Sequence, residues 1–247
     1  MLTVMDICKN KHVKHQLGVG CMMSYKTLRG LPNKWTDAFP KIDEYPKIFL
    51  DKPGLFNVLH YADYNRDSSA SDYVDAVLLC GPNLHAVQFD MIWPDPSHLE
   101  YLVYRGTHVR KPLKVILQVG SRAMAEVGDD PVKVCEKLSW YYHSDSIDYV
   151  LLDKSMGAGI GMDSALLLTY IYEIKKRLPS LSIVVAGGLG PTTMHLAEPI
   201  IREFPDISID AQGQMRTSAS ALLPIEWDRA SKYIRRANIL FAKYKKN

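Results

Sequence analysis

The chain has 247 residues, of which 47% are hydrophobic and 23% charged, close to the average globular protein. This composition excludes an intrinsically disordered chain, a collagen-like repeat and a small disulfide scaffold. The net charge of +3 comes from residues 229–247, which hold seven basic and no acidic side chains, so a general nucleic-acid surface is not expected. The length allows one α/β barrel or two small domains.

Nothing in the sequence indicates a membrane or secreted protein. No segment approaches the roughly 18 uncharged apolar residues that a bilayer span needs. Basic residues follow the short N-terminal apolar run instead of preceding it, unlike a signal peptide. The four cysteines are widely spaced with no C-x-x-C pair, so they are predicted to be reduced thiols. We therefore expect a cytoplasmic protein without membrane association.

The first 55 residues give an irregular pattern. Leu2–Cys8 and Gln16–Tyr25 predict two strands, but Lys9–His15 between them is too short for the crossover helix that parallel strands need. Trp35–Leu50 contains two prolines and predicts short helical pieces joined by turns.

From about residue 55, short apolar runs alternate with longer segments of helical periodicity, which predicts repeated β–α units and a parallel sheet. The predicted strands are Phe56–Tyr61, His85–Met91, Lys114–Val119, Asp148–Leu152, Ser182–Ala186 and Ile207–Asp210. Helix starts are predicted at Ser71, Asp95-Pro96, Asp130-Pro131, Asp163-Ser164 and Pro191-Thr192. A final helix carries Ile234, Leu240 and Phe241 on one face, and its basic residues predict a solvated opposite face.

Eight β–α units in a chain of this length predict a single (β/α)8 TIM barrel over residues 1–247, with an irregular N-terminal segment. In such barrels the active site lies at the carboxyl ends of the strands. A phosphate group often binds the loops after the seventh and eighth strands.

Glycine-bearing loops follow three of the predicted strands. Gly187 and Gly188 come after Ser182–Ala186, and Gly213 comes soon after Ile207–Asp210. Such glycines let backbone N–H groups approach an anion closely, although they also serve simply as tight turns. A third run, residues 155–161, lacks the G-x-G-x-x-G spacing of a dinucleotide site and suits a loop over a ligand better.

Polar side chains recur at the predicted strand ends, which is where a barrel enzyme keeps its acids, bases and anion-binding groups. They are Asp63 and Arg66, Gln88 and Asp90, Gln118 and Arg122, and Asp153. A rival zinc site of Cys8, His12, His15 and Cys21 has irregular spacing and no second Cys/His pair, so no metal is expected. No G-x-S-x-G elbow indicates a serine hydrolase.

Residues 56–216 resemble the phosphoribosylanthranilate isomerase family. Residues 183–194 (IVVAGGLGPTTM) are similar to its L-A-G-G-L-x-P-x-N-V motif, which is the most specific match. Three further segments resemble family motifs in the same order. AVQFD (86–90) is similar to V-Q-L-H, and YVLLDKSMGAGIGMD (149–163) is similar to L-L-D followed by G-G-T-G. ISIDAQGQMR (207–216) is similar to V-D-V-S-S-G-V-E.

The resemblance implies a TIM-barrel isomerase of tryptophan biosynthesis, which performs an aldose–ketose (Amadori) rearrangement of a phosphorylated aminosugar by acid/base catalysis without a cofactor. Asp153 matches the catalytic acid. Cys8, in a partial echo of the K-I-C-G motif, and Cys21 are competing candidates for the base. The phosphate loops correspond to Gly159 and Gly161, to Gly187 and Gly188, and to Gln212 and Gly213, while Gln88, Asp90, Arg66 and Arg122 are the further substrate-binding candidates.

Departures from the family pattern favour a retained phosphate site with a changed substrate. Asp90 replaces the family's histidine, Met215-Arg216 replaces its V-E, and its final G-K-D is missing. Two alternatives therefore stay open. One is a phosphosugar aldolase or epimerase using Lys154 or a carboxylate pair, and the other is a non-catalytic phosphate-ligand binding protein. In every case the expected partner is a phosphorylated small molecule, bound by a monomer or homodimer.

Overall fold

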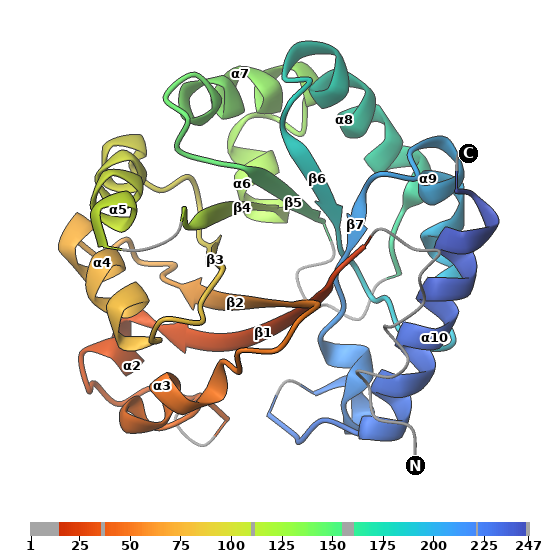
Figure 1. Ribbon diagram of the computed structural model, residues 1–247. Helices are drawn as coiled ribbons and strands as arrows, with labels where there is room; N and C mark the ends of the chain where they lie inside the picture. Colours follow the sequence, from red (N-terminus) through yellow and green to blue (C-terminus); the bar gives the residue numbers. More distant parts are fainter. Residues whose placement is uncertain (1–14, 36–37, 110–111, 155–160, 221, 246–247) are drawn as a thin grey trace.

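The protein, described by a computed structural model over residues 15–35, 38–109, 112–154, 161–220 and 222–245, is an α/β fold built on one parallel sheet. Seven strands pair in chain order and curl into a ring with helices outside it, as in a TIM barrel (Figure 1). The strands are β1 (Leu17–Ser24), β2 (Leu55–Ala62), β3 (Ala86–Asp90), β4 (Lys114–Gly120), β5 (Tyr149–Asp153), β6 (Ser182–Val185) and β7 (Ser208–Ile209).

Helices cover the outside of the sheet between successive strands. The α-helices are α2 (Tyr25–Leu28), α3 (Tyr45–Ile48), α4 (Ala70–Leu79), α5 (Pro96–Val109), α6 (Ser121–Glu126), α7 (Pro131–Tyr142), α8 (Ser164–Arg177), α9 (Glu198–Glu203) and α10 (Trp227–Lys243). Short 3₁₀ turns are η1 (Ile42–Glu44), η2 (Met194–Leu196), η3 (Gly213–Met215) and η4 (Thr217–Ala219).

The seven strands predicted from Gln16 onward are confirmed, and the eighth, Leu2–Cys8, lies outside the described residues. Asp130 and Asp163 cap their helices as predicted, each accepting a hydrogen bond from a backbone N–H of the first turn. The cap of α4 is Ser69 and not Ser71, because Ser69 forms a reciprocal capping box with Asp72.

The predicted helix start at Pro191-Thr192 is wrong. Thr193 instead donates from Oγ1 to the carbonyl of Gly188 at 2.7 Å, which holds the segment in turns. Helix α9 begins only at Glu198, where Pro199 occupies the first turn and needs no N–H partner. The loop after β6 is therefore longer than the sequence pattern indicates.

Alternation along the strands separates two apolar layers. Outward side chains such as Leu59, Leu117 and Leu152 are almost fully buried between the sheet and the helices. Inward side chains form a smaller cluster, consisting of Val58, Ala86, Ile116, Leu151, Val184 and Ala186. Both faces of the strands are apolar, as expected for a parallel sheet covered by helices.

Beta-strands β1 and β7, at the two ends of the sheet, are connected by side chains. Gln212, just after β7, donates from Nε2 to Sδ of Met22 in β1 at 2.6 Å. His15, just before β1, is bonded through Nε2 to the carbonyl of Ile207 at 2.9 Å and stacks on Phe241 of α10. These contacts bring the ends of the curled sheet together beside α10.

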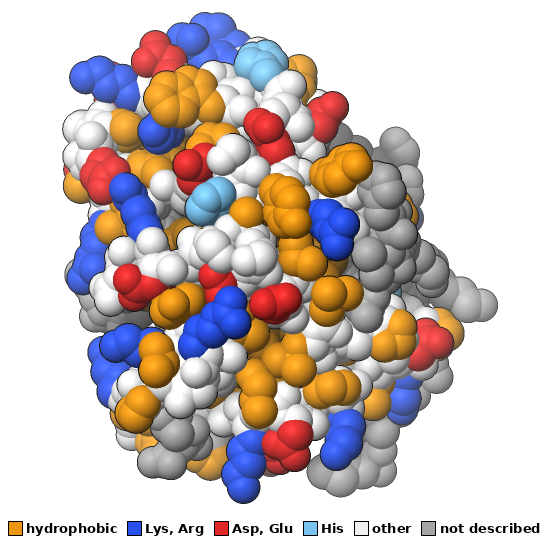
Figure 2. Space-filling view, turned by 90° about the vertical axis from the view of Figure 1, so that its left-hand side faces the viewer, with side chains coloured by type: hydrophobic (Ala, Val, Ile, Leu, Met, Phe, Trp, Pro, Cys, Tyr) orange, Lys and Arg blue, Asp and Glu red, His pale blue; other side chains and the backbone are white. Residues whose placement is uncertain are grey.

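The face of the molecule in Figure 2 mixes Lys and Arg with Asp and Glu around scattered hydrophobic side chains, so this face is not a basic surface. Among the helices in the described ranges, none is long and apolar enough to cross a membrane.

Truncation of an outward strand residue should test the main core. Leu152 is 0% exposed, so Leu152→Ala is expected to destabilise the fold by about 2–5 kcal/mol, through lost burial and the cavity left behind. Leu78→Ala in α4 is the control, since Leu78 is 43% exposed and should change stability by less than about 0.5 kcal/mol. Urea unfolding of both variants measures the difference, and equal losses would contradict the assigned layers.

Candidate functional site

Six polar side chains lie on the inward face of the sheet at its carboxyl end. We call them the polar ring, and they are His60 of β2, Gln88 and Asp90 of β3, Gln118 of β4, Asp153 of β5, and Asp210 just after β7. The strand register explains the grouping, because His60 is the register partner of Gln88. His60 lies two residues beyond the inward Val58, and Gln88 lies two residues beyond the inward Ala86. Residues two apart in a strand share a face, so these strands end in polar groups directed into the barrel.

A chain of hydrogen bonds fixes three members of the ring. The amide Nε2 of Gln88 donates to Oε1 of Gln118 at 2.8 Å and approaches Nδ1 of His60 at 3.4 Å. On the other side of the imidazole, Nε2 lies 3.2 Å from Oδ2 of Asp90. This pattern suits a His60 that donates to Asp90 and accepts from Gln88, which orients both side chains.

Asp90 is the ionised anchor of the ring. Its Oδ2 also accepts a 2.7 Å hydrogen bond from the hydroxyl of Tyr64. Burial favours the neutral acid, but the hydrogen bonds from His60 and Tyr64 and the attraction to His60 outweigh it, so the pKa of Asp90 lies below its usual value. Asp90 therefore holds its neighbours in place and is a poor proton donor.

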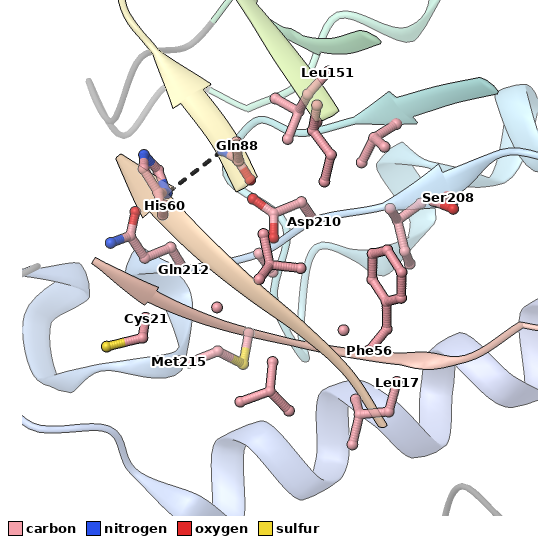
Figure 3. A pocket seen from close by; sticks show the side chains of 18 of the residues that line it. Leu17, Cys21, Phe56, His60, Gln88, Leu151, Ser208, Asp210, Gln212 and Met215 are labelled. Atoms are coloured by element: carbon pink, nitrogen blue, oxygen red, sulfur yellow. Dashed lines mark hydrogen bonds between the residues drawn. The ribbon is translucent and has the colours of Figure 1, made fainter. Parts of the chain in front are cut away.

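Asp210 has the opposite electrostatic character. It lines the barrel cavity, and its carboxyl points toward His60 and Gln88 (Figure 3). Burial is the main cause that raises the pKa of Asp210; attraction to His60 opposes it, the negative charge of Asp153 adds to it, and the Ala211 N–H opposes it least. The environment of Asp210 therefore shifts this carboxyl group toward its protonated form.

Three members of the polar ring, His60, Gln88 and Asp210, line a cavity of about 730 Å³ inside the barrel. His60, Gln88, Asp210 and Gln212 line its polar end. The remaining wall is mostly apolar and is contributed by Phe56, Val58, Ile116, Tyr149, Leu151 and Val184. A volume of this size is typical of small-molecule sites.

Cys21 does not suit the role of a base. It pairs in register with Leu59, whose side chain belongs to the outer layer, and packs against that layer. Its sulfur points away from Asp210 (Figure 3). Burial raises the pKa of the Cys21 thiol to about 12, so it is not a thiolate at neutral pH. The alternative base, Cys8, lies outside the described residues.

The two candidate arginines take different positions. The guanidinium of Arg122 lies 5.8 Å from the ring centre of Tyr64, so it stands beside the residue that anchors Asp90. Arg66 is turned away, since its Nε donates to the carbonyl of Ile92 and its side chain approaches Glu126. Only Arg122 is therefore placed to assist a ligand at the polar ring.

The glycine loops after β5, β6 and β7 pack against one another. A Cβ on Gly161 would lie 3.1 Å from Leu196 Cδ1, and one on Gly190 would lie 2.5 Å from Gln214 Cβ. Gly213 is similarly close to the carbonyl oxygen of Ala219, at 3.0 Å. Close packing between loops thus accounts for Gly161 and Gly190, and close packing within the loop after β7 accounts for Gly213. Gly159 lies outside the described residues.

Gly187 and Gly188 form the sharpest turn among these loops. Their φ values are 134° and 59°, a backbone conformation that other residues adopt at a cost. This turn directly follows Ala186, at the carboxyl end of the sheet. The sequence therefore located a turn at the rim of the barrel.

Sequence reasoning missed His60, Tyr64 and the special environment of Asp210. His60 stands inside an apolar strand, where alternation from Val58 is the signal that places it inward.

Among the described residues, no cluster of three or more His, Cys, Asp and Glu could hold a metal. Of the four zinc candidates, Cys8 and His12 lie outside those residues.

No protein-family model matches this chain, and no curated protein matches it in sequence. Solved structures do match. The chain is similar to TrpF from Jonesia denitrificans at 13% identity and a TM-score of 0.57, over 95% of this chain and 91% of that one.

The chain is also similar to Rhizobium etli pyruvate carboxylase, T882A variant crystallised without acetyl coenzyme A, at 10% identity and a TM-score of 0.54. That match covers 94% of this chain and 25% of the other. The Y628A carboxyl transferase domain of the same enzyme, with pyruvate, is similar at 11% identity and a TM-score of 0.54. That match covers 94% of this chain and 43% of the other. At such low identity these similarities establish the fold alone.

Asp210→Asn should raise stability in a pH-dependent way. A raised pKa means that ionising Asp210 costs more in the folded than in the unfolded chain, so wild-type stability falls as pH rises from about 4 through the folded pKa. The variant removes that cost and should melt higher at pH 7, by about 2–4 °C for each kcal/mol relieved. Melting curves of both proteins at pH 7 and below pH 4 check this, since the gain in melting temperature should vanish at acid pH. A variant that melts lower than wild type at pH 7 would contradict the raised pKa.

Proposed function

We propose that this protein is a barrel isomerase that rearranges a small phosphorylated aminosugar by acid/base catalysis. The observation that carries the proposal is the pair of carboxyl groups at the barrel mouth, because the environment of Asp210 favours its protonated form next to Asp153. Environments that push two carboxyl pKa values apart provide an acid and a base in one site. The fold similarity to TrpF and the motifs resembling phosphoribosylanthranilate isomerase support the same reaction class.

The chemistry needs two proton transfers. Opening the sugar ring requires a proton delivered to the ring oxygen, and isomerisation then requires removal of the proton on the adjacent carbon. We assign the first step to Asp210 and the second to the Asp153 carboxylate. This exchanges the role that the family resemblance gives to Asp153, since the raised pKa of Asp210 suits that residue to donate a proton.

Other members of the site would orient the substrate. The hydrogen-bonded set of His60, Gln88 and Gln118 offers both donors and acceptors to sugar hydroxyl groups. Backbone N–H groups of the loop at Gly187 and Gly188, with the nearby loop at Gln212, would receive the phosphate. Arg122 is the closest candidate side chain for a second anionic group of the substrate.

One alternative loses support from the geometry. Schiff-base chemistry at Lys154 needs a neutral amine, but Nζ of Lys154 lies 2.9 Å from Oδ1 of Asp129. That hydrogen bond and charge pair raise the pKa of Lys154, which keeps it protonated. An aldolase that uses Lys154 is therefore a poorer fit than proton transfer by the carboxyl pair.

The test is turnover of phosphoribosylanthranilate, followed by the loss of anthranilate fluorescence. Wild type should be active, while Asp153→Asn and Asp210→Asn should each lower kcat/KM by about 10²–10⁴-fold, the usual contribution of one acid or base. Glu126→Gln, at an exposed position of α6, is the matched control and should leave kcat/KM unchanged.

Two results would count against the proposal. An inactive wild type that still binds phosphate esters would identify a binding protein instead. An active wild type whose Asp210→Asn variant keeps full activity would remove Asp210 from the mechanism.

A further inference from the structure

Within the described part of the chain, the barrel interior is poorly filled next to β1. Gly18 and Gly20 are in register with the inward residues Phe56 and Val58, and a Cβ added to either glycine would have no atom of the described residues within 4 Å. Ser208 of β7, which also lines the cavity, is a further small inward residue. Bulky branched side chains normally fill this space in TIM barrels. Small residues at these positions therefore leave a chamber inside the sheet.

This chamber is apolar and continuous with the polar ring. Its wall is formed by Phe56, Val58, Ile116, Tyr149, Leu151 and Val184, and the same cavity reaches Asp210 and Gln212 (Figure 3). An unfilled apolar cavity costs stability, because its lining loses packing contacts. The chamber thus suits the apolar part of a ligand.

Two polar groups bordering the same cavity lack partners within the described part of the chain. The hydroxyl of Tyr233, on α10, and Nε of Arg216 are buried without a hydrogen bond. Another guanidinium nitrogen of Arg216 donates to the carbonyl of Leu223. Among the ion pairs formed by described residues, none includes Arg216. A buried donor left unsatisfied is costly, and a buried cation normally meets an anion.

We propose that the cavity binds an amphipathic organic acid, with its carboxylate on Arg216 and Tyr233 and its hydrocarbon part in the chamber. Arginine N–H and tyrosine O–H groups are both donors, which a carboxylate accepts strongly. The proposal does not depend on the isomerisation, because it concerns binding by residues other than Asp153 and Asp210.

Calorimetry with straight-chain acids from hexanoate to decanoate, at pH 8, tests the proposal. Each added methylene should tighten binding about threefold to fourfold until the chamber is full, as expected for burial of a CH₂ group. Arg216→Met should weaken binding of every acid by a similar factor, about tenfold or more, since it removes the carboxylate partner. Arg235→Met, which changes an exposed arginine of the same region, is the control and should have no effect.

Filling the chamber provides a second, independent measurement. Gly20→Val should weaken decanoate binding at least tenfold and Gly20→Ala less, while the melting temperature holds or rises, because a β-branched side chain suits a strand and meets no atom there. Three results would each overturn the proposal: no acid binds, affinity does not change with chain length, or Gly20→Val binds decanoate as tightly as wild type. A lower melting temperature for Gly20→Val would show that protein atoms already occupy the space. None of these outcomes alters the turnover test of the isomerase.

Discussion

Parallel register is the constraint on which the rest of this structure depends. Each strand is aligned with the next so that side chains facing the helices alternate with side chains facing the barrel axis. Burial of Leu59, Leu117 and Leu152 against the helices fixes that alternation, since a slip of one residue would turn these side chains to the barrel axis and the polar ring residues toward the helices. The same choice directs the neighbouring His60 and Gln118 inward. The hydrophobic core therefore positions the polar ring without any separate device.

Within the ring, two aspartates meet different electrostatic conditions although both are removed from bulk water. Asp90 receives hydrogen bonds from His60 and Tyr64, which more than offset the cost of burying its charge. For Asp210 the cost of burial, with the negative charge of Asp153 added, outweighs the attraction to His60 and the hydrogen bond from the Ala211 N–H. One fold thus lowers the pKa of one carboxyl group and raises the pKa of another, and proton transfer needs such a difference.

The sequence predicted the sheet well, because short segments rich in β-branched apolar residues, such as Lys114–Val119, have few alternatives to a strand buried on both faces. Asp153, Gln88 and Gln118 were found since a polar residue at the end of such a run is easily noticed. His60 was missed because it lies inside its run, and the burial that raises the pKa of Cys21 and makes it a poor candidate base is not visible in the sequence. The start of α9 and the chamber depend on contacts between distant segments, which local patterns do not contain.

The packed glycine loops have a consequence for how this barrel can change. Gly161 touches the segment after β6, and Gly190 touches the segment after β7, so each loop is shaped against its neighbour. A side chain introduced at one glycine would displace the adjacent loop as well as its own. The rim on this side of the barrel behaves as one interlocked body, and new specificity there requires coordinated substitutions in several loops instead of the exchange of a single one.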